Sequence, residues 1–169
     1  AADRIPSHGG SLRGIAQLAG GIYTQEPSIS LALAHENQLG LHRSETLGLL
    51  SGKINSVRDQ LKSLLDDKKK SGKTIVGFGA PAKATTLMYH FDIGSKIIEF
   101  IVDDSPLKQG LHSPGMHIPI LPSEAIYQKN PDVIVILAWN FAEPIMKAHK
   151  RFSEDGGEFI VPFPEVKVY

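Results

Sequence analysis

From residue 73 to the end of the chain, short apolar runs alternate with stretches of helical periodicity. The apolar runs predicted as strands cover residues 74–78, 97–102, 132–137 and 158–161. The helices predicted between them cover residues 82–91, 123–128 and 142–152. Strands that are apolar along their whole length are buried on both faces, and helical connections between them favour parallel pairing. The pattern therefore predicts an α/β fold, a Rossmann-like parallel sheet with flanking helices.

The residues before this sheet carry a different pattern. Pro27 suits the first position of a helix, and helical periodicity continues from there to residue 70. Its clearest part is a stripe of apolar residues at steps of three and four, namely Leu47, Leu50, Ile54, Val57, Leu61 and Leu64. This stripe predicts one long helix over residues 44–70. Short alternation over residues 11–18 predicts a strand that has no partner within its own segment.

Composition and charge narrow the classes of function. The chain has 169 residues, no cysteine, and 18 Lys and Arg against 18 Asp and Glu. Zero net charge argues against a nucleic-acid-binding protein that relies on bulk electrostatics, and the lack of cysteine excludes disulfides and thiolate zinc sites. No apolar run approaches the roughly 18 residues of a membrane span. We therefore expect no nucleic-acid or membrane partner, and a cytoplasmic location.

The turn after the first strand of the predicted sheet carries a glycine motif. Residues 77–82 read Gly-Phe-Gly-Ala-Pro-Ala, the G-x-G-x-x-A form of the dinucleotide-binding fingerprint. Gly77 permits a tight turn, and Gly79 permits close approach of a ligand to the backbone. Lys83 adds an ammonium to the first helical turn, where backbone N–H groups attract anions. The alternative is a strand–helix turn that binds nothing, with Lys83 solvated.

Polar residues also follow the next two strands, where ligands bind in open parallel sheets. These candidates are Asp103, Asp104, Ser105, Lys108, Trp139 and Asn140. An acid at this distance from the glycines binds the ribose of nicotinamide cofactors, although an Asp-Ser-Pro sequence is also ordinary turn chemistry. Trp139 could stack on a base or sugar while Asn140 hydrogen-bonds to it, or the indole could close the core.

The histidines give weaker signals. His8, beside two glycines, could be a base or a phosphate contact, and a structural role in the turn is the alternative. His112 and His117 lie in one loop, but no carboxylate cluster completes a metal site. We therefore expect no metal ligands in this chain.

Several segments together resemble the multi-domain S-adenosylmethionine-dependent sugar C-methyltransferases. They are residues 6–13 (PSHGGSLR), 77–86 (GFGAPAKATT), 102–110 (VDDSPLKQG), 137–141 (LAWNF) and 156–162 (GGEFIVP). The matching segments occur in order over essentially the whole chain. In that family, a zinc-binding N-terminal region precedes a methyltransferase domain, and a Rossmann-like C-terminal domain closes over a nucleotide-linked keto-sugar.

The resemblance implies that this chain corresponds to the C-terminal domain. Residues 1–25 would be the closing strand segment of a methyltransferase domain, residues 26–72 a helical linker, and residues 73–169 the nucleotide-sugar-binding domain. The zinc-binding cysteines, the S-adenosylmethionine loop and the Tyr-His-Glu-His stretch with the catalytic base have no counterpart here. We therefore expect zinc and S-adenosylmethionine in the full-length enzyme, and no bound cofactor, catalytic residue or activity in this chain alone.

The expected function is to hold the nucleotide diphosphate of a keto-sugar in deoxysugar biosynthesis, with the upstream methyltransferase domain of the same chain as partner. The predicted substrate contacts in the sheet domain are Gly77, Gly79, Lys83, Asp103, Asp104, Ser105, Lys108, Trp139 and Asn140. His8, Ser11 and Arg13 are expected at the junction with the methyltransferase domain. Two alternatives stay open, an NAD(P)-binding module of an oxidoreductase and an oligomerisation module built on the long helix.

Overall fold

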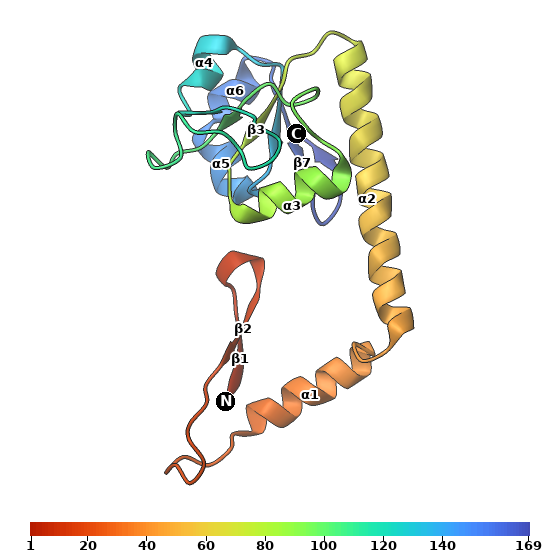
Figure 1. The fold of residues 1–169 in the computed structure, drawn as a ribbon, viewed down its shortest axis with the longest axis vertical. Coiled ribbons are helices and arrows are strands. Elements are labelled where there is room, and N and C mark those ends of the chain that lie inside the picture. The colour runs from red at the N-terminus through yellow and green to blue at the C-terminus, as the bar shows by residue number, and fades with distance from the viewer. The chain divides into compact units, whose positions relative to one another are not determined.

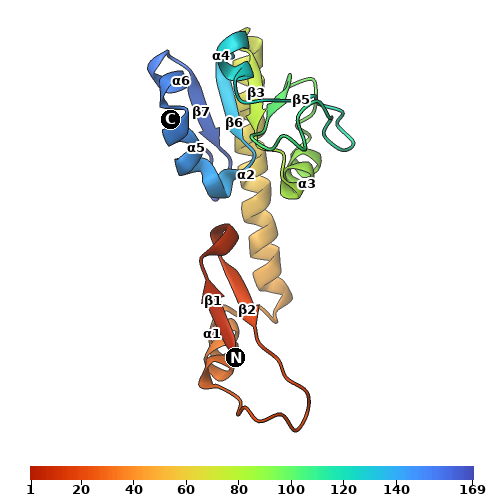
Figure 2. The same ribbon diagram turned by 90° about the vertical axis from the view of Figure 1, so that its left-hand side faces the viewer.

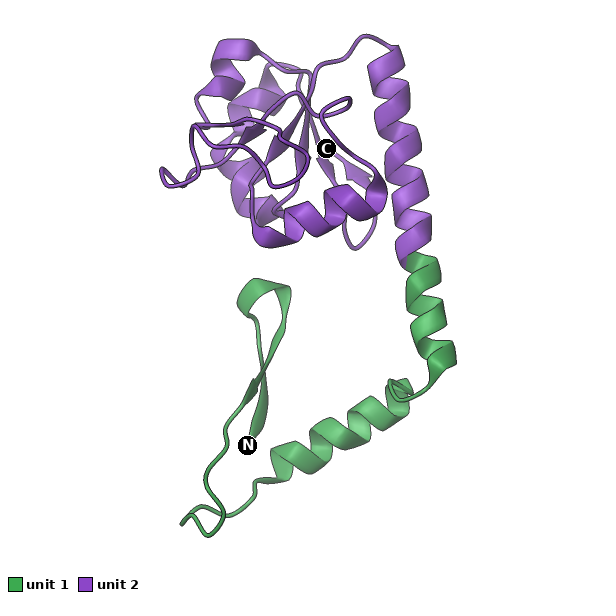
Figure 3. Cartoon of the chain, viewed as in Figure 1, with its two compact units in different colours: residues 1–53 green, residues 54–169 purple.

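The computed structural model describes residues 1–169 and contains two compact units, residues 1–53 and 54–169 (Figure 3). The first unit contains a hairpin of β1 (Ala2–Ile5) and β2 (Ser11–Gly14), a 3₁₀ turn η1 (Ser7–Gly9), and helix α1 (Pro27–Leu39). Helix α2 (Ser44–Lys70) begins in the first unit and ends in the second. No helix of the structure combines the length and apolar character needed to cross a membrane.

The second unit is built on one six-stranded sheet. Its strands are β3 (Ile75–Phe78), β4 (Ile101–Val102), β5 (Ile120–Leu121), β6 (Val133–Ile136), β7 (Glu158–Val161) and β8 (Lys167–Val168). They lie in the order β5-β4-β3-β6-β7-β8, all parallel except β8, and Figure 2 shows β7, β6, β3 and β5 side by side in this order. The predicted α/β fold with a mostly parallel sheet is confirmed.

Helices cover both faces of this sheet. One face carries α2 and α3 (Ala82–Phe91), and the other carries α4 (Ala125–Lys129), α5 (Ala142–Ala148) and α6 (Lys150–Glu154) (Figure 1). Adjacent strand residues serve opposite faces, because side chains alternate along a strand. Ile75 packs in the core under α2 and α3, whereas Val76 packs in the core under α4 to α6. Because helices bury both faces of the sheet, strands such as β3 and β6 are apolar along their whole length.

The long helix forms over the predicted residues, but only its second half contributes to the core. Val57, Leu61 and Leu65 are its buried side chains. Leu47 and Leu50, which belong to the predicted apolar stripe, are exposed. Periodicity identifies a helix, but it does not show which turns of that helix have a packing partner.

Three of the expected elements differ in the structure. The strand in residues 11–18 does have a partner in its own segment, since Ser11–Gly14 pairs antiparallel with Ala2–Ile5. The apolar run 97–102 is a strand only over Ile101–Val102, because residues 97 and 98 close a turn on Gly94.

The helix expected over residues 142–152 is interrupted at His149, whose φ of −108° and ψ of 30° separate α5 from α6. Strands β5 and β8 were not expected, since neither is long enough to show a period.

Candidate functional site

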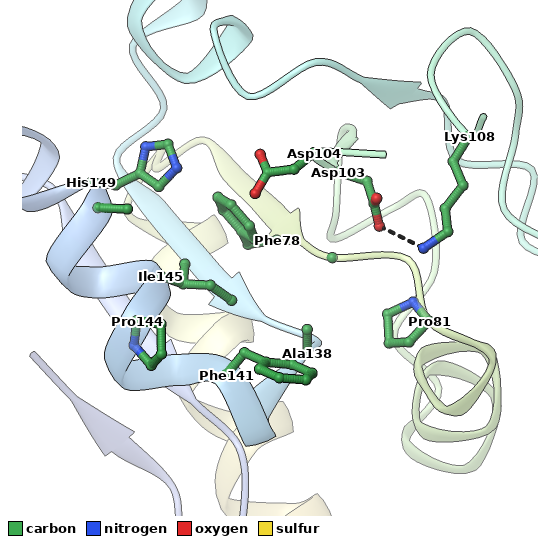
Figure 4. A pocket seen from close by; sticks show the side chains of 12 residues that line it. Phe78, Pro81, Asp103, Asp104, Lys108, Ala138, Phe141, Pro144, Ile145 and His149 are labelled. Atoms are coloured by element: carbon green, nitrogen blue, oxygen red, sulfur yellow. Dashed lines mark hydrogen bonds and ion pairs between the residues drawn. The ribbon is translucent and has the colours of Figure 1, made fainter. Parts of the chain in front are cut away.

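A cavity of about 470 Å³ lies at the carboxyl ends of β3, β4 and β6 in the second unit (Figure 4). Its lining comprises Phe78, Gly79, Pro81, Asp103, Asp104, Lys108, Ala138, Phe141, Pro144, Ile145, Ala148 and His149. After β3, the chain adds β4 and β5 on one side and then returns to place β6 on the other. The cavity therefore lies where the direction of strand addition reverses, which is the general location of ligand sites in open α/β sheets.

The two glycines of the motif have different roles in the structure. Gly79 lines the cavity at φ +88°, and a Cβ on it would lie 2.6 Å from the Cβ of Ala138. Both the backbone conformation and the lack of space therefore require glycine there. Gly77 is inside the sheet, where a Cβ would lie 2.7 Å from Leu137 Cδ1. Because it is buried and absent from the lining, Gly77 serves packing between strands and is not brought to the cavity.

Asp103 braces the loop that follows β3. Its side chain is 10% exposed, and its carboxylate accepts hydrogen bonds from Ala80 N–H at 2.7 Å, Ser105 N–H at 2.9 Å and Lys108 Nζ at 3.0 Å. Burial acts to raise the pKa of the Asp103 carboxyl, but these three donors outweigh it and hold the pKa below its ordinary value. The carboxylate thus connects the loop after β3 to the segment of residues 103–108, and both segments contribute to the lining of the cavity.

Asp104 points the other way. Figure 4 shows its side chain directed toward His149, while the side chain of Asp103 is directed toward Lys108. Asp104 is exposed, and Ser123 donates a hydrogen bond from its hydroxyl to Oδ1 of this carboxylate. Of the two adjacent acids, Asp104 is therefore the one whose carboxylate remains accessible at the cavity.

His149 is a lining residue that sequence reasoning missed. Its imidazole is half-buried, shares a 3.0 Å hydrogen bond between Nδ1 and the Tyr127 hydroxyl, and lies 5.0 Å from the ring of Phe78. Burial lowers the pKa of His149, although Asp104 and Glu124 act in the opposite direction. The available signal was spacing, since Ile145 and His149 are four residues apart and so share the helix face that meets the sheet.

Much of the lining is apolar. The contributing side chains are Phe78, Pro81, Ala138, Phe141, Pro144, Ile145 and Ala148. Phe141 ends the 3₁₀ turn η2 (Trp139–Phe141) and is 50% exposed. This wall gives the cavity an apolar side and a polar side that face each other (Figure 4).

Trp139 and Lys83 are near one another but outside the lining. Lys83 Nζ lies 4.4 Å from the centre of the Trp139 ring, and burial lowers the pKa of this ammonium. The indole also packs against Phe163, with ring centres 5.3 Å apart. This packing favours the alternative in which Trp139 closes the core. Asn140 follows it in the turn η2.

The remaining predicted residues have local partners. The Ser105 N–H belongs to the Asp103 brace. Ser11 Oγ donates to the Ser7 carbonyl at 3.0 Å, and Arg13 forms an ion pair with Asp3 at 3.1 Å, both within the hairpin of the first unit.

His8 occupies η1 at φ +53°, the turn that joins the two strands. The role expected for His8, Ser11 and Arg13 at a domain junction stays a prediction.

The residues present do not fit a metal centre. No group of three or more His, Cys, Asp or Glu side chains is close enough together to hold an ion. The zinc of the resembling family therefore has no ligand set in this chain. What the arrangement offers is binding, with an apolar wall on one side and hydrogen-bonding groups on the other.

Comparisons with known proteins identify the family. Residues 6–164 match the family model described as the C-methyltransferase C-terminal domain. The chain is 37% identical over 161 residues to the C-methyltransferase NovU of Streptomyces niveus. The aligned region covers 95% of this chain. It spans 38% of the length of that relative. The match of the family model and the identity to this relative both extend over nearly the whole chain, and the chain belongs to the family of C-methyltransferase C-terminal domains.

Proposed function

We propose that this domain binds the nucleotide-linked keto-sugar substrate of an S-adenosylmethionine-dependent C-methyltransferase. S-Adenosylmethionine and the catalytic base would come from the methyltransferase domain upstream in the same chain. The observation that carries the proposal is the cavity at the carboxyl ends of β3, β4 and β6. Its volume of about 470 Å³ is within the roughly 300–1,000 Å³ typical of small-molecule sites.

The chemistry of the lining supports a ligand that is partly apolar and partly rich in hydroxyl groups. Asp104, Lys108 and His149 supply acceptors and donors on one side, and Phe141 with Ile145 supplies apolar surface on the other. A nucleotide-linked sugar has both kinds of surface. Membership of the C-methyltransferase family supports a role in the same reaction, in which the domain positions the substrate.

The oxidoreductase alternative is weakened at one residue. In nicotinamide-binding folds, the acid that follows the second strand accepts hydrogen bonds from the ribose hydroxyls. Asp103 has this position, but its carboxylate is buried and already accepts three hydrogen bonds from the protein. Titration of the 169-residue chain into NADH separates the two proposals, and we expect no change in NADH fluorescence.

Isothermal titration calorimetry with a dTDP-linked and a GDP-linked hexose tests the proposal directly. We expect saturable heat with at least one of them at millimolar concentration. Ala148→Leu, which places a larger side chain in the lining, is expected to abolish that heat. Lys83→Ala is expected to weaken binding several-fold if the ammonium beside Trp139 contacts the phosphates. Absence of saturable heat with both ligands, or unchanged binding in Ala148→Leu, would contradict the proposal.

A further inference from the structure

The charged side chains of the cavity give it a negative balance. Asp103 and Asp104 contribute two carboxylates, and Lys108 contributes one ammonium, which is bonded to Asp103 at 3.0 Å. Burial lowers the pKa of the His149 imidazole, which disfavours its charged form. The carboxylate of Asp104 is thus left without a cation in the lining to balance it.

The side chains of this lining do not suit a diphosphate. Proteins bind phosphate groups with cations and with free backbone N–H groups at helix N-termini. Here the loop amide of Ala80 already donates to Asp103, and the ammonium of Lys108 is engaged by the same carboxylate. The remaining carboxylate of Asp104 would repel the phosphate charges.

The same lining suits an uncharged ring system that bears hydroxyl groups. The half-exposed ring of Phe141, with Pro144 and Ile145 beside it, offers a surface on which a flat base can stack. Asp104 faces this wall from the other side of the cavity (Figure 4). A carboxylate is an acceptor only, which matches the hydroxyl donors of a ribose or deoxyribose.

We infer that the cavity receives the nucleoside end of the nucleotide-linked ligand and not its diphosphate, with Phe141 against the base and Asp104 accepting hydrogen bonds from the sugar hydroxyls. The inference rests on the proposed function and adds to it which part of the ligand is recognised and by which residues. Asp103 is given no role in ligand recognition, because its carboxylate already accepts three hydrogen bonds from the protein. The diphosphate would leave the cavity through its open side.

Chemical-shift perturbation on the ¹⁵N-labelled 169-residue chain tests this with separate probes, namely thymidine, guanosine, inorganic pyrophosphate, methyl glucoside and a dTDP-linked hexose. We expect a nucleoside and the dTDP-linked hexose to shift the amide signals of Gly79, Asp104 and Phe141. Pyrophosphate in tenfold excess is expected neither to shift these signals nor to displace the nucleoside.

Variants assign the contacts. Asp104→Asn is expected to weaken nucleoside binding about tenfold, the usual effect of losing a hydrogen bond to a charged group. Phe141→Leu keeps apolar volume but removes the stacking ring and is expected to weaken binding to a similar extent. Glu124→Gln is the matched control, because Glu124 is a nearby carboxylate outside the lining, and binding should change less than twofold. If Asp104→Asn fails to fold, Phe141→Leu carries the test alone.

The outcomes separate this inference from the function on which it rests. Two outcomes overturn the inference but leave the proposed function intact. In one, pyrophosphate displaces the bound dTDP-linked hexose; in the other, the dTDP-linked hexose binds but the nucleosides do not. A response to methyl glucoside in place of nucleosides overturns it in the same way, by assigning the cavity to the sugar end. No response to any probe contradicts both.

Discussion

Asp103 and Asp104 are adjacent in the sequence but belong to different environments. Successive residues that leave a strand point in opposite directions, so one of the two had to turn inward. The side chain of Asp103 turns toward the loop after β3 and the residue is buried, whereas Asp104 is exposed beside His149. The sequence predicts an acidic pair at this strand end, but it cannot assign the roles. That assignment depends on where the Ala80 N–H lies once the sheet has formed.

Asp103→Asn is expected to lower the free energy of unfolding by about 1.5–3 kcal/mol, since hydrogen bonds to a charged group are lost or weakened at a buried position. Urea unfolding at pH 7, followed by circular dichroism, measures this. Asp104→Asn is the control and should change the free energy of unfolding by less than about 0.5 kcal/mol, as is usual for exposed positions. Equal losses in the two variants would contradict the assignment of Asp103 as the brace.

The same carboxyl predicts part of the acid sensitivity. Because the pKa of Asp103 is lower in the folded than in the unfolded protein, its stabilising contribution is complete above the unfolded value of about 4. It is lost as the pH falls through the folded-state pKa. Asp103→Asn should therefore show a smaller loss of stability than the wild type between pH 5 and pH 2, measured by urea unfolding at each pH.

His149 should titrate below its ordinary pKa of 6.5, because its ring is half-buried. Its contribution to stability is then present above pH 6.5 and declines as the pH falls from there toward the folded-state pKa. The ring proton signals of His149, followed by NMR against pH, measure the titration. Asp104→Asn is expected to lower this pKa further, since the nearby carboxylate favours the protonated ring. An unchanged or higher pKa in that variant would contradict the proximity of the two groups.

Gly79→Ala should be more destabilising than the same change at Gly110. Both residues have positive φ, +88° and +81°, and so both pay a conformational cost of about 1–2 kcal/mol as alanine. Only Gly79 has a neighbour in the way, with Ala138 Cβ 2.6 Å from the added methyl group, whereas Gly110 has open space. We expect an additional loss of about 1–3 kcal/mol at Gly79, measured by thermal unfolding. Equal losses would mean that the loop after β3 moves away without cost.

At the scale of elements, the sequence predicts the long helix and the parallel sheet well, because both depend on periodicity and burial over many residues. It fails where an element is defined by its partner. Ile97 and Ile98 are apolar and buried, as strand residues would be, yet they lie in a turn. Strands β5 and β8 have two residues each and exist only through pairing with β4 and β7. No Gly or Pro marks the interruption at His149, so nothing local predicts it.

Helix α2 offers a test of the oligomerisation alternative. Leu61 is fully buried in the core of the second unit, so Leu61→Ala should cost about 2–5 kcal/mol of unfolding free energy. Leu50 is 53% exposed, and Leu50→Ala should cost less than about 0.5 kcal/mol if no partner covers it. Urea unfolding of both variants, with light scattering of the wild type, makes the comparison. A large loss for Leu50→Ala together with a dimer in solution would support oligomerisation through the first half of the helix.

At the scale of the whole molecule, apolar surface is unequally buried. Twelve of the eighteen exposed large hydrophobic side chains belong to residues 1–53, and α1 buries none of its side chains. The second unit buries two apolar clusters, one on each face of its sheet. The periodicity does not reveal this difference, because Leu47 and Leu50, which are exposed, belong to the same helical stripe as Leu61, which is fully buried. Burial requires a partner surface, which the local pattern does not contain.

Amide hydrogen exchange should therefore separate the two units in the 169-residue chain. A helix of thirteen residues without buried side chains, such as α1, is marginally stable in water, and its amides should exchange with little protection. The amides of β3 and β6 lie in the centre of the sheet between two apolar clusters and should open only with global unfolding. Protection in these strands should exceed that in α1 on the order of a thousand-fold or more. Protection in α1 equal to that in β6 would contradict independent stability of the two units and would imply that the exposed leucines of the first unit are covered in solution.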